Sequence, residues 1–72
     1  MKPKPQQYRR NDLVAVQEGA ELLNKPGAVL EEDQTGIVLG YVGNNVVVQL
    51  LDGRTRLTVE ESYVIPNQEK KQ

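Results

Sequence analysis

The sequence lacks the residues on which most enzymatic and metal sites rely. Its 72 residues include no cysteine and no histidine. A disulfide framework, a thiolate metal site and the commonest general base are therefore excluded. Serine occurs once, at Ser62, and it has no histidine to activate it. We expect a protein that is not an enzyme and that holds neither a cofactor nor a metal ion.

Aromatic residues are also scarce. The chain has no tryptophan and no phenylalanine, and its three tyrosines are Tyr8, Tyr41 and Tyr63. A groove for proline-rich peptides or a cage for methylated lysine needs several rings converging on one ligand. Neither kind of site is expected here.

Long apolar runs are missing as well. No stretch approaches the roughly 20 residues of a membrane-spanning helix, and the N-terminus lacks the hydrophobic segment of a signal peptide. We therefore expect no membrane association and a cytoplasmic location.

The charges are unevenly distributed along the chain, although the formal net charge is only −1. Residues 1–10 contain four cations and no carboxylate, whereas residues 11–66 contain three cations and nine carboxylates, a formal charge of −6. The basic, proline-containing segment 1–10 and the polar segment 67–72 have little to bury. We expect both to be disordered, with Tyr8 inside the mobile arm, and a single folded domain at residues 11–66.

Residues 36–65 alternate between apolar and polar side chains, which is typical of half-buried strands. Gly43-Asn44-Asn45 and Asp52-Gly53 divide this stretch into three strands, and a two-residue Asp52-Gly53 turn would place Gln49 opposite Arg56. For the first turn, a loop of Gly43-Asn44 and a loop of Asn44-Asn45 predict the same core face. That face comprises Ile37, Leu39, Tyr41, Val46, Val48, Leu50, Leu57 and Val59.

The rest of the chain is expected to complete an all-β fold. A first strand spans residues 13–17, residues 18–34 form a structured long loop because Gly19 and Pro26 leave too little room for a helix, and residues 60–62 form a single 3-10 turn. A short strand at residues 63–65 ends before Pro66.

This order, with the segments Asn11–Val16, Thr35–Val38 and Val48–Gly53, resembles the SH3-like small barrels of the Tudor and KOW type. The resemblance covers residues 11–66 and implies a five-stranded SH3-like barrel. It carries no particular activity.

The other face of the meander is the predicted binding surface. Apolar side chains remain there at Val38, Val42, Val47 and Leu51, and they are either exposed for a partner or buried by the loop at residues 18–34. We expect a non-catalytic binding or adaptor module that engages a protein, or a second copy of itself. The residues predicted to contact the partner are Val47, Gln49, Leu51, Arg54, Arg56 and Tyr63.

The alternative partner is nucleic acid. Tudor and KOW relatives often act in transcription and translation, and Arg54, Arg56 and the basic arm could contact phosphates. The acidic body disfavours this alternative because it repels phosphate.

Overall fold

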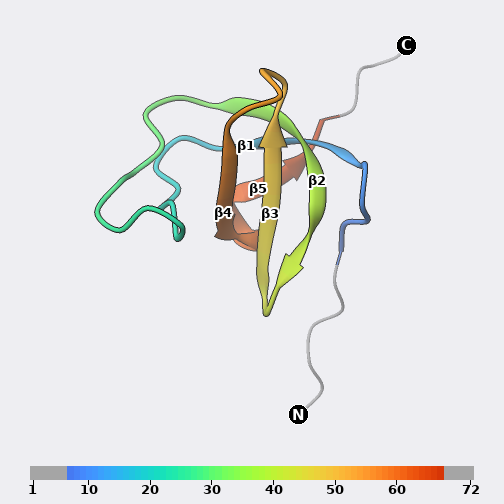
Figure 1. Cartoon of the computed structure of the whole chain (residues 1–72), viewed down its shortest axis with the longest axis horizontal. Coiled ribbons are helices and arrows are strands. Elements are labelled where there is room, and N and C mark those ends of the chain that lie inside the picture. Colours follow the sequence, from blue (N-terminus) through green and yellow to red (C-terminus); the bar gives the residue numbers. More distant parts are fainter. Residues whose placement is uncertain (1–6, 68–72) are drawn as a thin grey trace.

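The computed structural model describes residues 7–67, and these form an all-β fold. The elements are β1 (Leu13–Val16), β2 (Gln34–Val42), β3 (Asn45–Leu50), β4 (Arg56–Glu60), the 3-10 turn η1 (Glu61–Tyr63) and β5 (Val64–Pro66). Every paired neighbour is antiparallel, in the order β4-β3-β2-β1-β5 (Figure 1). The predicted all-β class, with five strands and a single 3-10 turn before the last strand, is confirmed. Within residues 7–67, no helix is long and apolar enough to cross a membrane.

Strand β2 connects the two halves of the sheet. Its residues 34–37 pair with β1, and its residues from Gly36 onward pair with β3. The sheet bends around this strand, so that β1 and β5 lie behind β3 and β4 (Figure 1). The end strands β4 and β5 do not pair with each other, which leaves the sheet of the described residues open.

The core lies between the two halves of the bent sheet. Alternate residues of each strand face inward, as the two-residue period of a strand requires. The buried apolar side chains are those of Tyr8, Val14, Val16, Ala20, Val38, Val46, Val48, Leu57, Val59 and Val64. Most of them are valines, whose branched side chains pack well on a pleated surface.

The second hairpin has the register that the sequence predicts. Gln49 lies opposite Arg56, and Val48 lies opposite Leu57. The connection is wider than the predicted two-residue turn, because Asp52 Oδ1 accepts hydrogen bonds from the backbone N–H groups of Arg54 and Thr55. Strand β4 therefore begins only at Arg56.

The first hairpin contains a β-bulge that was not predicted from the sequence. Its turn is Gly43-Asn44, since Val42 pairs with Asn45, but the register shifts between Val38 and Gly40. The extra residue reverses the inward and outward sides of β2 for the residues that precede it. Val38 is consequently buried in the core opposite Val48. The predictions that Ile37 and Leu39 are core residues are wrong, whereas Val38 is buried, which is one of the two alternatives that the sequence left open for it.

The folded part of the chain begins before residue 11. Tyr8 is only 7% exposed and belongs to the core, so the prediction that it lies in a mobile arm is wrong. Its phenol ring supplies apolar area that a core with few aromatic residues otherwise lacks. At the other end, the Asn67 N–H group donates a hydrogen bond to the carbonyl oxygen of Leu13. The predictions of disorder for residues 1–6 and 68–72 lie outside the described residues.

The loop at residues 18–34 is structured and contains no helix, as predicted. Its two arms form a bridge between Glu21 and Val29. The loop also covers the outer edge of β4: the Leu23 N–H group donates to the Thr58 carbonyl oxygen at 2.7 Å, and the Asn24 side chain bonds the backbones of Arg56 and Thr58. An edge strand whose backbone groups are occupied in this way is protected from pairing with another chain.

Candidate protein-binding surface

A row of four outward-facing residues crosses the bent sheet. Leu13 on β1 lies opposite Ile37 on β2, Ile37 lies opposite Gln49 on β3, and Gln49 lies opposite Arg56 on β4. Side chains that are directly opposite on antiparallel strands are close enough to pack together. We call Leu13, Ile37, Gln49 and Arg56, together with Ile65, the outer-face patch.

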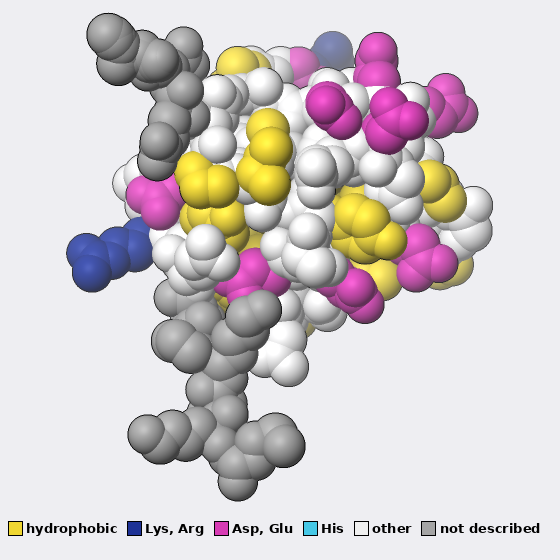
Figure 2. Space-filling model, turned by 180° about the vertical axis from the view of Figure 1, so that it is seen from behind, with side chains coloured by type: hydrophobic (Ala, Val, Ile, Leu, Met, Phe, Trp, Pro, Cys, Tyr) yellow, Lys and Arg dark blue, Asp and Glu magenta, His cyan; other side chains and the backbone are white. Residues whose placement is uncertain are grey.

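The β1 half of this patch is apolar. Leu13 is 38% exposed, although β1 buries its neighbours Val14 and Val16 completely. Ile65 is 43% exposed on β5 and lies opposite Ala15, two residues along β1 from Leu13. In the view from behind, hydrophobic side chains reach the surface in several separate groups (Figure 2). This half of the patch therefore presents aliphatic surface.

The β3–β4 half contains two of the six residues predicted to contact a partner. Gln49 and Arg56 are brought together as predicted, and the Gln49 side chain also donates a 2.9 Å hydrogen bond to the Gly53 carbonyl oxygen. Val47 lies between Gly40 and Thr58, one row away from Gln49, and is half-buried. Both Gln49 and Val47 are therefore on the outer side, since their neighbours Val46 and Val48 are buried.

Leu51 and Arg54 occupy the turn after β3. Both are exposed, and Leu51 is 63% exposed. Arg54 does not share a strand with Arg56, because Arg54 precedes β4 and its backbone is held by Asp52.

Asp52 fixes the shape of this turn. Its carboxylate accepts hydrogen bonds from the N–H groups of Thr55 and Arg54, and Oδ2 accepts a 2.7 Å hydrogen bond from the Thr55 hydroxyl. These bonds, that of the Thr55 N–H group foremost, lower the pKa of Asp52 from 3.8 to about 2. The turn is consequently held in one geometry beside Gln49.

Tyr63 does not join the outer-face patch. It lies in η1, packs partly against the core, and its carbonyl oxygen accepts a hydrogen bond from the Gln17 N–H group. The hydroxyl group of Tyr41 is bonded to Glu61, and that of Tyr8 is bonded to the Val64 carbonyl oxygen. Each hydroxyl-bonded tyrosine therefore has a structural role.

Among residues 7–67, no group of three or more histidine, cysteine, aspartate or glutamate side chains is arranged to hold a metal ion. Ser62, the only serine, is exposed on η1.

Comparison of the chain with family models, with curated proteins and with solved structures gives no match.

Three members of the outer-face patch were missed from the sequence: Leu13, Ile37 and Ile65. The signal that could have found Ile37 is Gly40, because a glycine inside a strand pattern often marks a bulge. Gly40 has a φ of +155°, which side chains rarely allow. For Leu13 and Ile65, the alternation of residues along a strand predicts which side chains point outward. It does not predict which of these remain exposed to solvent.

Proposed function

We propose that the chain is a non-catalytic protein-binding module that contacts its partner through the outer-face patch. The observation that carries this proposal is the uninterrupted row from Leu13 through Ile37 to Gln49 and Arg56. Partly exposed aliphatic side chains bordered by polar groups are typical of protein interfaces, where an apolar centre is surrounded by a polar rim.

The mode of binding we propose is side-chain contact, because both edges of the sheet are blocked. The edge of β4 is occupied by Leu23 and Asn24. On β5, the carbonyl oxygen of Val64 accepts the Tyr8 hydroxyl, and Pro66 has no N–H group to donate. Addition of a partner's strand requires free backbone groups along an edge. The face of the sheet is then the surface that remains for a partner.

The finer assignment to the SH3-like small barrels belongs to the same proposal. It is supported by the strand order β4-β3-β2-β1-β5, by the long loop between β1 and β2 and by the 3-10 turn before β5. The shortage of aromatic residues favours an aliphatic partner surface over a methylated lysine or a proline-rich peptide.

A protein is the partner class that the charges favour. Residues 11–66 carry a formal charge of −6, which repels phosphate groups. If the partner is a protein held by aliphatic contact, the dissociation constant should change little with salt concentration. A nucleic acid would instead give a dissociation constant that rises steeply with salt, roughly in proportion to the number of phosphates contacted.

The experiment that tests the proposal compares captured partners among matched variants. The full chain, Leu13→Ser, Ile37→Ser and a control variant Val42→Ser are immobilised and exposed to lysate of the source cells. Val42 is an exposed aliphatic residue on β2 outside the patch, so its replacement removes comparable surface. A protein retained by the wild type and by Val42→Ser, but lost from both patch variants, supports the proposal. Retention by the patch variants, with all variants shown to be folded, contradicts it.

A further inference from the structure

The loop between β1 and β2 has a second exposed surface, distinct from the outer-face patch. Its residues 19–30 form an irregular hairpin, closed by hydrogen bonds from Leu30 N to Ala20 O and from Leu22 N to Ala28 O. One side of this hairpin packs inward, with Ala20 fully buried and Leu22 and Leu30 against the core. The Glu21–Val29 bridge lies on the alternate residues, which therefore face away from the core.

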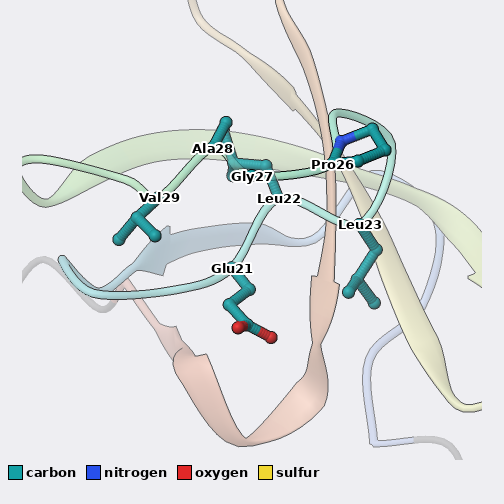
Figure 3. A pocket seen from close by; sticks show the side chains of 7 residues that line it. All are labelled: Glu21, Leu22, Leu23, Pro26, Gly27, Ala28 and Val29. Carbon is teal, nitrogen blue, oxygen red and sulfur yellow. The ribbon is translucent and has the colours of Figure 1, made fainter.

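The hairpin forms a shallow hollow of about 460 Å³. Its lining consists of Glu21, Leu22, Leu23, Pro26, Gly27, Ala28 and Val29. The side chains of Glu21, Leu23 and Val29 extend to the same side of the loop, whereas Ala28 extends away from them (Figure 3). Leu23 is 42% exposed and Val29 is 50% exposed, so two aliphatic groups and one carboxylate are presented together.

The backbone beneath this hollow is held in place. The Leu23 N–H group is bonded to Thr58 on β4, and the Lys25 and Ala28 N–H groups are bonded to carbonyl oxygens within the loop. A surface that is already ordered loses little entropy when a ligand binds. None of the hydrogen bonds found within residues 7–67 uses the carboxylate of Glu21.

We propose that this hollow binds a lysine or arginine side chain from a basic segment of a partner protein. Such a side chain has an aliphatic stem and a cationic end. The stem fits against Leu23 and Val29, and the cation meets the Glu21 carboxylate, where a charge-assisted hydrogen bond can form. This binding goes beyond the proposed function, because it uses a different surface and a different chemistry.

The loop that contains the hollow carries a charge complementary to a basic segment. Residues 18–33 contain five carboxylates, at Glu18, Glu21, Glu31, Glu32 and Asp33, and a single cation at Lys25. Acidic side chains also gather near one another on the face shown in Figure 2. An acidic loop attracts a cationic partner over a distance of about 10 Å at moderate ionic strength. The aliphatic walls then select a side chain with a stem over a bare cation.

The test uses a blocked peptide, acetyl-Ala-Ala-Arg-Ala-Ala-amide, added to the ¹⁵N-labelled full chain while backbone amide shifts are recorded. The comparison peptide carries citrulline, which has the shape of arginine without its charge. The protein variants are Glu21→Gln and Leu23→Ser, with Glu32→Gln as the control that removes one charge from the same loop outside the hollow. We expect saturable shifts confined to the amides of residues 21–29. We also expect at least a threefold weaker dissociation constant in Glu21→Gln, consistent with an exposed ion pair.

The outcomes separate this site from the outer-face patch and from general charge attraction. Loss of binding in Glu21→Gln and Leu23→Ser, with retention in Glu32→Gln and weaker binding of the citrulline peptide, supports the proposal. Equal weakening by Glu21→Gln and Glu32→Gln overturns it, because the peptide would then sense only net charge. Shifts confined to Leu13, Ile37 and Ile65 also overturn it, although they would support the outer-face patch.

Discussion

The phenol oxygen of Tyr8 lies 2.9 Å from the carbonyl oxygen of Val64 and donates a hydrogen bond to it in the protein interior. This bond joins the segment before β1 to the last strand of the sheet, 56 residues away in sequence. It also occupies a backbone acceptor on the edge strand β5. The segment before β1 is thus part of the fold, and its aromatic ring completes the core.

Replacement of Tyr8 by phenylalanine should lower the free energy of unfolding by about 1–2 kcal/mol, because the buried Val64 carbonyl group loses its partner. Replacement by alanine should lower it by about 3–5 kcal/mol, since the ring leaves a cavity. Urea unfolding followed by circular dichroism measures both values. Equal stability of Tyr8→Ala and the wild type would show that the segment does not pack on the core.

Stability should fall at alkaline pH through Tyr41 and Tyr8. Burial, followed by the hydrogen bond to Glu61, raises the pKa of Tyr41 above 10.0, and burial likewise raises the pKa of Tyr8. A raised pKa in the folded state means that the stabilising contribution is complete below pH 10 and is lost as the pH rises through the folded value. The unfolding free energy should therefore decline above pH 10. Tyr41→Phe should show a shallower decline, and an unchanged profile would contradict this assignment.

Asp52 should make the second hairpin sensitive to acid. Its pKa is about 2 in the folded chain, against an ordinary value of 3.8. A lowered pKa gives a contribution that is present above pH 3.8 and disappears as the pH falls toward 2. The carboxyl carbon of Asp52, followed by NMR, should titrate near pH 2, and the amide of Thr55 should shift with the same midpoint. In Asp52→Ala that transition of the Thr55 amide should be absent, whereas a midpoint near 3.8 in the wild type would exclude the hydrogen-bonded turn.

Gly36 should be the least replaceable glycine of the sheet. A Cβ atom there would lie 2.6 Å from the Gln49 carbonyl oxygen and 2.6 Å from Val48 Cγ1. Gly36→Ala should therefore lower the free energy of unfolding by at least about 1–3 kcal/mol through overpacking. At Gly40 a Cβ atom meets nothing within 4 Å, and Gly40→Ala should lower it by about 1 kcal/mol through backbone strain alone. Thermal unfolding of the two variants, compared directly, checks that Gly36→Ala is the less stable of the two.

The sequence was informative wherever local chemistry decides the structure. The register of β3 with β4 followed from Asp52-Gly53 and the alternation of valines. The absence of a helix at residues 18–34 followed from Gly19 and Pro26. Both features depend on residues that are close together in the sequence, so the sequence alone is enough to predict them.

The parts that could not be predicted depend on residues distant in sequence. The bulge at Leu39 is permitted by Gly40, but its position depends on how β2 must bend to pair with β1 and β3 together. Tyr8 looked like part of a basic arm, and only the packing of β5 gives its hydroxyl a partner. The composition of the outer-face patch depends on both the bulge and the packing of β5. Its apolar half could therefore not be predicted from the sequence.

A matched pair of substitutions at Ile37 and Val38 tests the central claim most directly. The bulge places Ile37 on the outer-face patch and Val38 in the core, where Val38 is fully buried. The measurement is urea unfolding of Ile37→Asp and Val38→Asp, combined with capture of the partner that the wild type retains. Val38→Asp should be unfolded, since a buried unpaired charge destabilises by more than about 4 kcal/mol. Ile37→Asp should fold and lose its partner, whereas unfolding of Ile37→Asp, or full partner binding by it, would contradict the account.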